Sequence, residues 1–346
     1  MKDRYIVTGA AGHVGSTILR ELKDRSDIEI YALVRAGGTK AKINSENIHY
    51  VIGNVKDRES LEGLFEGAEG DIYFIHCAAI ISIQRKVSKE IYDVNVKGVD
   101  NVIDACLKHN VKKLVHVSSV HAIPDLKKGE TMKEIYEFSP DAVEGSYAKT
   151  KAEACKHIME AIKEKGLPAV MVFPSGIMGP YDEGANHLIQ MCIMHMKGKL
   201  PASVKGGYDF VDVRDVATGC ISALEKGKIG ECYILSNYYI KMTELLDMIS
   251  DYKGLKHLKT MPVWLAKFGA PFVEAYCKMK KIRPLYTLYS VNVIASNGHF
   301  SHEHATNDLG YNPRAMEEIV HDMCDYIEEV VIKPEEEAKK NKKNKK

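Results

Sequence analysis

Tyr147 and Lys151 are spaced so that together they can move a proton. They are four positions apart, and on a helix their side chains lie one turn from each other on the same face. An ammonium beside a phenol stabilises the phenolate and lowers the tyrosine pKa from its solution value of about 10. We therefore predict that Tyr147 donates or accepts a proton near neutral pH. The same spacing also occurs on ordinary solvated helix faces, so the rest of the chain must decide.

Three glycines near the N-terminus indicate a phosphate-binding turn. Gly9, Gly12 and Gly15 follow an apolar run at residues 5–8 and precede a segment with helical periodicity from residue 16. A glycine-rich turn between a strand and a helix lets the backbone approach a pyrophosphate, which then rests on the helix N-terminus. The spacing is G-x-x-G-x-x-G and not the G-x-G-x-x-G of the dehydrogenase fingerprint. We predict nucleotide binding, and the alternative is a glycine-rich turn without a ligand.

The residue that follows the second predicted strand bears on the choice of cofactor. That strand covers residues 29–34 and ends at Arg35, about twenty residues past the glycines, where an acidic residue would bind a ribose 2′-hydroxyl. An arginine suits a 2′-phosphate instead. Lys40 and Lys42 follow and add positive charge. The sequence therefore favours NADP(H), with NAD(H) as the alternative.

Strand and helix patterns alternate through the first half of the chain. Further strands are predicted at 48–52, 71–75, 113–117 and 167–173, and helices at 58–65, 90–109 and 147–165. This alternation predicts an α/β fold, a Rossmann-type doubly wound parallel sheet with helices on both faces. Cys77, Ala78 and Ala79 end one strand, and such small residues leave room for a ligand at that edge of the sheet.

The second half of the chain is less regular. Helices are predicted at 187–197, 216–224, 243–251, 263–280 and 314–331, a short strand is predicted at 231–235, and residues 174–180 are predicted to form a loop. We expect a dinucleotide-binding domain at 1–180, whose sheet is completed by segments near 208–236. A smaller, mostly helical substrate-binding portion is expected at 181–332. Residues 333–346 are almost all Lys, Glu and Asn, which predicts a disordered charged tail.

Composition excludes several classes of protein. The 346 residues contain 48 Lys and Arg against 47 Asp and Glu, which leaves no electrostatic footprint for nucleic acid. The eight cysteines are scattered without a C-x-x-C pair, so we expect reduced thiols in a cytosolic protein and neither disulfides nor a metal site. No run approaches the ~18 apolar residues of a membrane span.

Taken together, the motifs resemble the extended short-chain dehydrogenase/reductase family, nearest its dihydroflavonol-4-reductase-like and 3β-hydroxysteroid-dehydrogenase-like branch. The matching motifs appear in the family's order: Thr8-Gly-Ala-Ala-Gly-His-Val-Gly15, His76-Cys-Ala-Ala79, Asn95-Val-Lys-Gly98, Val117-Ser-Ser119, Tyr147-Ala-Lys-Thr-Lys151, Phe173-Pro-Ser-Gly-Ile-Met-Gly-Pro180 and Val211-Asp-Val-Arg-Asp215.

The resemblance implies a role for each matching residue. Tyr147 would exchange the proton with the reacting oxygen, Lys151 would lower its pKa and hold the nicotinamide ribose, and Asn95 would support the lysine through a water. Ser119, in preference to Ser118, would bind the substrate oxygen. The residues expected to contact the cofactor are Gly9, Gly12, His13, Val14, Gly15, Arg35, Lys42, Asn54, Val55, Cys77, Ala78, Ala79, Tyr147, Lys151, Pro174, Ser175 and Ile177.

Three residues depart from the family pattern. Asn54 stands where an acidic residue commonly meets the adenine, and an amide can also make that hydrogen bond. His13 replaces an aromatic residue between the last glycines, and Arg35 replaces the acid of NAD-preferring members.

The substrate class is open between two branches of the family. From residue 151 onward the arginines are Arg214, Arg283 and Arg314, fewer than a nucleotide diphosphate would attract. This half also contains methionines and aromatic residues that suit an apolar pocket, although such a stripe is more often core. They are Met191, Met194, Met196, Trp264, Phe268, Phe272, Tyr276, Met279, Tyr286 and Tyr289.

We therefore predict an oxidoreductase for an apolar ketone or secondary alcohol such as a steroid or flavonoid. The alternatives are a nucleotide-sugar epimerase or dehydratase that recycles its cofactor, and a non-enzymatic dinucleotide sensor. Residues 261–296 are a further candidate for a lid or a membrane-leaning surface. The partner is expected to be a small molecule, and the family resemblance allows a homodimer.

Overall fold

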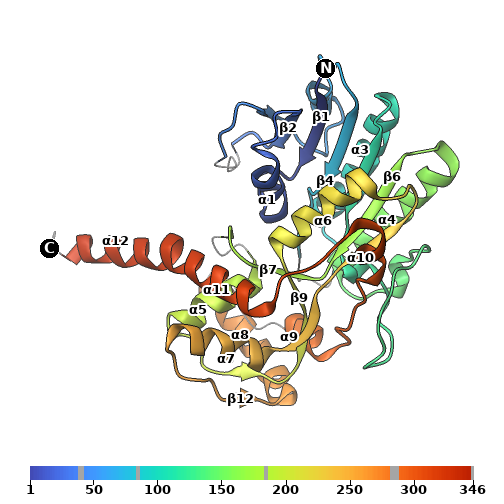
Figure 1. The fold of residues 1–346 in the computed structure, drawn as a ribbon. Coiled ribbons are helices and arrows are strands. Elements are labelled where there is room, and N and C mark those ends of the chain that lie inside the picture. Colours follow the sequence, from blue (N-terminus) through green and yellow to red (C-terminus); the bar gives the residue numbers. More distant parts are fainter. Residues whose placement is uncertain (38–42, 83–85, 183–185, 281–287, 344–346) are drawn as a thin grey trace.

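A seven-stranded parallel sheet forms the centre of the N-terminal half (Figure 1). The computed structural model describes the chain except for residues 38–42, 83–85, 183–185, 281–287 and 344–346. The strand order is β10-β6-β5-β4-β1-β2-β3, so the chain reverses direction across the sheet between β1 and β4. Ligands bind at such a switch point, beyond the carboxyl ends of the strands. The strands are β1 (Asp3–Thr8), β2 (Ile28–Val34), β3 (Ile48–Ile52), β4 (Ile72–His76), β5 (Lys113–Val117), β6 (Ala169–Pro174) and β10 (Cys232–Leu235).

Helices cover both faces of this sheet. On one face, α1 (His13–Leu22), α6 (Val213–Lys226) and α10 (Glu303–Leu309) bury apolar side chains against the strands. On the other face, α3 (Gly98–Lys108) and α4 (Ser146–Lys165) do the same. Burial on both faces explains why the strand sequences are continuous apolar runs without alternation. The predicted doubly wound α/β fold is confirmed.

The C-terminal portion is mostly helical and lies below the sheet in Figure 1. A small sheet of order β11-β9-β7 joins the two portions, and β8 pairs with β12. Segment 208–212 belongs to this small sheet, so of the predicted range 208–236 only β10 completes the large one. The elements are β7 (Gly176–Met178), α5 (His187–Met196), β8 (Ser203–Val204), β9 (Gly207–Asp212), β11 (Tyr238–Lys241), α7 (Met242–Lys253), β12 (Thr260–Met261), α8 (Val263–Lys280), α9 (Leu288–Ala295) and α11 (Met316–Ile327).

Several helical segments are not α-helical. The predicted helix at 58–65 is the 3-10 helix η1 (Glu59–Leu64), and the helix predicted at 90–109 consists of α2 (Lys89–Tyr92), the π-helical turn η2 (Asp93–Lys97) and α3. Short 3-10 turns η3 (Val120–Ala122) and η4 (Pro140–Ala142) lie within the long connection before α4. A π-helical turn inside a helix often marks a functional position.

The C-terminal tail differs from the prediction of disorder. Residues Lys333–Lys343 form helix α12, which continues from α11 through the π-helical turn η5 (Glu328–Ile332) and projects from the body (Figure 1). Ion pairs support it, because Lys333 pairs with Glu329, and Glu335 accepts from Lys197 at 2.8 Å. Lys333–Glu329 and Lys339–Glu335 are i, i+4 pairs, a spacing on a helix that composition alone does not reveal.

Candidate active site

Two glycines of the turn after β1, Gly9 and Gly15, leave no room for a side chain. Gly9 has φ +67°, and a Cβ there would lie 2.8 Å from the backbone nitrogen of Ala78. A Cβ on Gly15 would lie 2.3 Å from the carbonyl oxygen of Gly9. Gly12 is the N-cap of α1, so the turn presents the N-terminus of that helix at the edge of the sheet. This is the arrangement that accepts a pyrophosphate on backbone N–H groups.

A pocket of about 310 Å³, here called the glycine-loop pocket, opens beside this turn. Eight predicted cofactor residues line it: Gly9, Gly12, Arg35, Asn54, Val55, Cys77, Ala78 and Ala79. Lys56 and Glu90 also line it and were not predicted. Lys56 lies just beyond the end of β3, at the sheet edge that carries the other lining residues, so its position along the chain was the available signal.

Arg35 and Asn54 occupy this pocket in different ways. Arg35 is exposed at the end of β2. The side-chain oxygen of Asn54 accepts from the backbone N–H of Lys56 at 3.1 Å, and its own backbone N–H donates to Ser60 Oγ at 2.9 Å. Asn54 therefore shapes its own turn as well as lining the pocket. Lys42 and Lys40 lie outside the described residues.

The other predicted cofactor residues do not line the glycine-loop pocket. They are His13, Val14, Gly15, Tyr147, Lys151, Pro174, Ser175 and Ile177. The ring of His13 is mostly buried, and its Nε2 lies 2.7 Å from the carbonyl oxygen of Pro180. Burial lowers the pKa of His13, although the nearby Asp182 acts in the opposite sense. His13 thus joins the glycine turn to the segment after β7.

Ser175 is held by a buried carboxylate that the sequence did not reveal. Its hydroxyl donates to Asp209 Oδ1 at 2.5 Å, and the backbone N–H of Asn237 donates to the same oxygen at 3.0 Å. Burial raises the pKa of Asp209 to about 6, and the two hydrogen bonds oppose that rise. Ser175, Asp209 and Asn237 together connect the end of β6 with β9 and the start of β11.

Tyr147 and Lys151 lie at the start of α4 beside the end of β5. Helix α4 begins after Gly145, whose φ of +97° turns the chain into the helix. Both side chains are buried, and Lys151 Nζ donates to the carbonyl oxygen of Val117 at 2.8 Å. Burial lowers the pKa of Lys151 to about 8, so the ammonium form still dominates at neutral pH. The pair therefore lies at the edge of the sheet where β5 ends.

The two serines after β5 have different surroundings. Ser118 Oγ lies 2.9 Å from the buried thiol of Cys155 on α4. Ser119 Oγ accepts from the backbone N–H of His121 at 3.3 Å and caps the short turn η3. Ser118 is therefore engaged with the protein core, whereas the Ser119 hydroxyl keeps its proton for another acceptor. This difference is consistent with the preference for Ser119 that the family resemblance implies.

Asn95 sits in the π-helical turn η2. Its side-chain oxygen accepts from the backbone N–H of Ile80, and its amide nitrogen donates to Ile80 O at 3.0 Å and to Thr150 Oγ1 at 3.1 Å. Thr150 is the neighbour of Lys151 on α4. Asn95 thus fixes residue 80, which lines the glycine-loop pocket, against the helix that carries the tyrosine and the lysine.

A second pocket, of about 620 Å³, opens beside Tyr147 and is here called the His121 pocket. The ring of His121 meets the ring of Tyr147 edge-on at 6.1 Å and stacks on Tyr208 at 5.9 Å. Burial lowers the pKa of His121 to about 4, so its ring is neutral. The pocket is lined by His121, Ile123, Asp125, Asp141, Ala142, Val143, Glu144, Gly145, Ala148, Lys149, Tyr208, Asn292, Val293 and Ser296.

The methionines and aromatic residues proposed for an apolar pocket lie elsewhere. Met191 is buried in the core, and Met194 and Met196 are half-buried on the same helix, α5. Trp264, Phe268, Phe272 and Met279 are exposed on α8, so the expectation that they line a pocket is wrong. Tyr286 lies outside the described residues, and so do the side chains of Tyr276 and Tyr289. Helical spacing alone did not distinguish an outward face from an inward one.

Comparisons with known proteins agree with this geometry. The model of the NAD dependent epimerase/dehydratase family matches residues 5–236, which is more than half of the chain, and the chain belongs to this family. The resemblance to extended short-chain dehydrogenases and reductases is thereby confirmed. The residues matched by the family model include those that line the glycine-loop pocket. The glycine turn and the neighbouring strand ends are the parts that a dinucleotide would occupy.

The chain is similar to a Synechocystis sp. protein named as a provisional dihydroflavonol 4-reductase, with 28% identity over 95% of both chains. It is also similar to sterol demethylase protein B of Methylococcus capsulatus, with 30% identity over 72% of this chain and 74% of that one. The crystal structure of gox2253 superimposes with a TM-score of 0.80 at 31% identity and covers 94% of this chain and 98% of that one.

Among the described residues, no helix is both long enough and apolar enough to cross a membrane.

Proposed function

We propose that this protein is a nicotinamide-dependent oxidoreductase that reduces a ketone, or oxidises a secondary alcohol, on a fairly apolar small molecule. The bound cofactor supplies or accepts the hydride. The chain supplies the proton and the orientation, with Tyr147 exchanging the proton at the substrate oxygen and Ser119 donating a hydrogen bond to the same oxygen. Lys151 is held at the carbonyl of Val117, one turn of α4 beyond Tyr147, and would supply the positive charge that favours the phenolate.

The charges that line the His121 pocket favour an apolar substrate over a nucleotide sugar. Three carboxylates, those of Asp125, Asp141 and Glu144, face one ammonium, that of Lys149. Burial, together with Glu144, raises the pKa of Asp125, so another negative charge near it is unfavourable. A nucleotide sugar carries a diphosphate, and this lining would repel it.

The arginines of the C-terminal half support the same choice. Arg214 pairs with Asp212 at 2.7 Å and with Asp322 at 2.5 Å. Arg314 pairs with Asp215 and with Glu318. Both are therefore engaged by carboxylates and are poor candidates for binding phosphate. Arg283 lies outside the described residues.

The names of two relatives are consistent with an apolar substrate, since one is named for dihydroflavonol and one for sterol. A nucleotide-sugar epimerase or dehydratase is the second candidate, because the matching family includes both activities by its description. A non-enzymatic sensor would have no need of Ser119, Tyr147 and Lys151 together. We further propose NADP(H) as the preferred cofactor, because Arg35 and Lys56 both line the glycine-loop pocket.

Net turnover of the cofactor separates the two enzymatic candidates. The purified chain is offered steroid, flavonoid and sugar-nucleotide panels with NADP(H) and NAD(H), and absorbance of reduced nicotinamide is followed. We expect a net absorbance change with a steroid or flavonoid ketone or alcohol. Conversion of a sugar nucleotide without net absorbance change would contradict the proposal and assign the epimerase or dehydratase activity instead.

A further inference from the structure

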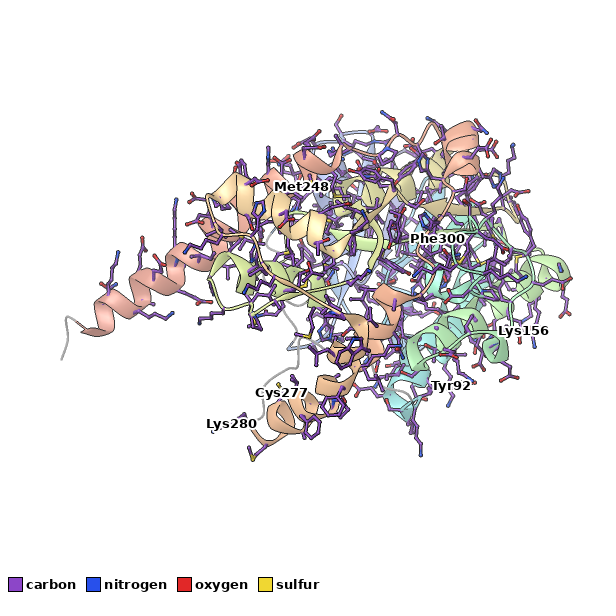
Figure 2. The ribbon with its side chains drawn as sticks, turned by 90° about the horizontal axis from the view of Figure 1, so that it is seen from below. Tyr92, Lys156, Met248, Cys277, Lys280 and Phe300 are labelled. Atoms are coloured by element: carbon purple, nitrogen blue, oxygen red, sulfur yellow. The ribbon has the colours of Figure 1, made fainter. Side chains whose placement is uncertain are left out.

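Helix α8 presents large apolar side chains to its surroundings. Trp264, Phe268, Phe272 and Met279 are 70%, 68%, 67% and 71% exposed, and they are here called the α8 face. The first three are spaced by four residues, so they form one stripe, and the rings of Phe268 and Phe272 lie 5.8 Å apart. Figure 2 shows α8, with Cys277 and Lys280 near its end, projecting from the body of the molecule. Large contiguous apolar patches of this kind mark an interaction site.

The side chains of α8 that are buried, among those the structure describes, are small. Ala266, Ala270 and Cys277 are buried, and Ala266 packs with Val204 and with Val291 of α9. This pattern is the reverse of an ordinary surface helix, which turns its large apolar residues toward the core. Since the aromatic residues contribute little to the internal packing of the protein, their stripe is available to something outside it.

Basic residues flank the stripe. At 3.6 residues per turn the four side chains of the α8 face fall within an arc of about 80°, with Lys267 on one side and Lys280 on the other. Over residues 263–283 the sequence contains Lys267, Lys278, Lys280, Lys281 and Arg283 against the single acidic residue Glu274. Glu274 accepts from the backbone N–H of Leu288 at 2.7 Å and so ties α8 to the start of α9.

We propose that the α8 face rests on an anionic lipid bilayer, with α8 lying in the plane of the membrane surface. An aromatic and apolar stripe flanked by lysines is the pattern of a helix that binds at the lipid interface. The tryptophan and phenylalanines enter the boundary between headgroups and acyl chains, and the lysines meet anionic headgroups. The charged residues of α8 keep it on the surface, in accord with the lack of a membrane-crossing helix among the described residues.

A second copy of the chain fits this face less well. A symmetric dimer through α8 would bring the same patch of each copy together, and so would set the lysines of one copy near those of the other. Such like-charge contacts are unfavourable, whereas an anionic membrane complements them.

The bound face is connected to the His121 pocket. Helix α9 packs on α8 through Val291, and its residues Asn292 and Val293 line the pocket. The helix that packs on α8 therefore also builds a wall of the proposed substrate site, which would let an apolar substrate enter from the lipid. Lipid binding itself does not depend on the proposed function, because it can be measured without turnover.

The full chain provides its own probe, because Trp264 is its single tryptophan. We would titrate the protein with vesicles of phosphatidylcholine and phosphatidylglycerol in equal parts, and with phosphatidylcholine vesicles. Tryptophan emission and flotation with the vesicles would both be measured. We expect a blue shift and co-flotation with the anionic vesicles, and weaker binding to the neutral ones.

Two sets of variants test the two components. Phe268→Ser with Phe272→Ser should weaken binding about a hundredfold, since each phenylalanine contributes roughly tenfold or more. Lys267→Gln with Lys280→Gln should weaken binding to anionic vesicles only, by about fivefold per lysine. Ile229→Ser removes an apolar side chain that is 56% exposed away from α8 and is the matched control, which should bind like the wild type.

Folding and self-association are controlled separately. Circular dichroism and cofactor binding show whether the phenylalanine variant keeps its fold, which we expect because both side chains are exposed. Wild-type protein that floats with neither vesicle, or equal binding by the phenylalanine variant, would overturn the proposal. A dimer in vesicle-free solution that the phenylalanine variant loses, without vesicle binding by the wild type, would also overturn it and assign the face to a second copy.

Discussion

The glycine-loop pocket and the His121 pocket lie on either side of the proposed reaction centre, and they are built in different ways. The first is lined largely by glycines, alanines and other residues at the ends of neighbouring parallel strands. The second is lined by side chains of mixed charge from four separate segments, represented by Ile123, Glu144, Tyr208 and Val293. The first pocket depends on backbone shape that few residues permit, whereas the second depends on side chains that can vary without harm to the fold. The first therefore indicates the cofactor class, and the second is the pocket that we propose for the substrate.

The largest expected effect tests whether Tyr147 acts in proton transfer and not in cofactor binding. We expect Tyr147→Phe to lower turnover by about a thousandfold or more, because the variant keeps the ring but loses the exchangeable proton. Cofactor affinity should change little, as Tyr147 does not line the glycine-loop pocket. Steady-state kinetics and cofactor titration measure the two quantities. Substantial activity in this variant would remove Tyr147 from the proton path.

The adjacent serines offer a matched pair for the next test. We expect Ser119→Ala to lower kcat about a hundredfold, because the substrate oxygen loses a hydrogen bond that strengthens in the transition state. Ser118→Ala should lower kcat by only a few fold, since Ser118 meets Cys155 in the core. Kinetics of both variants under identical conditions decide between them. A larger loss in Ser118→Ala would reverse the assignment.

The fold and the cofactor site could be predicted further from the sequence than the substrate site. Gly9 and Gly15 can be recognised in the sequence, because a Cβ at either position would clash with nearby backbone and glycine is therefore required. The order of the strands then places Cys77, Ala78 and Ala79 at the same edge of the sheet. The prediction for Tyr147 came from its spacing to Lys151, and the prediction for Ser119 came from the family resemblance.

The remainder depends on contacts between segments that are distant in the sequence. Asp209 and Ser175 are 34 residues apart, and only the small sheet brings them together. The aromatic stripe of α8 had the right periodicity for an amphipathic helix, but periodicity does not say which side faces the core. Strands as short as β8 and β12 carry too few residues to show a pattern.

The junction between the two portions should make stability depend on pH through Asp209. Its pKa is raised to about 6 in the folded protein, from an ordinary value of 3.8. The folded state therefore binds more protons than the unfolded state between these values, and the free energy of unfolding falls as pH rises through this window. Asp209→Asn keeps an acceptor for Ser175 and removes the titration.

We expect Asp209→Asn to unfold like the wild type near pH 4 and to be more stable at pH 7, by about 3 kcal/mol for a pKa shift of this size. Urea denaturation at a series of pH values measures the difference. Asp308→Asn is the control, because Asp308 is a half-buried carboxylate whose pKa is lowered by its hydrogen bond with Lys228, so its loss should produce no gain at pH 7. A gain that is independent of pH would show that Asp209 acts through packing and not through ionisation.

The smallest expected effect concerns Arg35 and Lys56, the two basic side chains of the glycine-loop pocket. We expect these side chains, and not the backbone, to determine the preference between NADP(H) and NAD(H). Arg35→Asp should weaken NADP(H) binding about tenfold or more, because a charge-assisted pair with the 2′-phosphate becomes a repulsion. NAD(H) binding should change little, since it lacks that phosphate. Lys56→Gln is the companion variant, with an expected loss of a few fold for NADP(H), because a single exposed charge contributes modestly. Dissociation constants for both cofactors, measured at low and moderate salt, separate the two residues. An equal loss of affinity for NAD(H) and NADP(H) in Arg35→Asp would mean that Arg35 shapes the pocket and does not contact the 2′-phosphate.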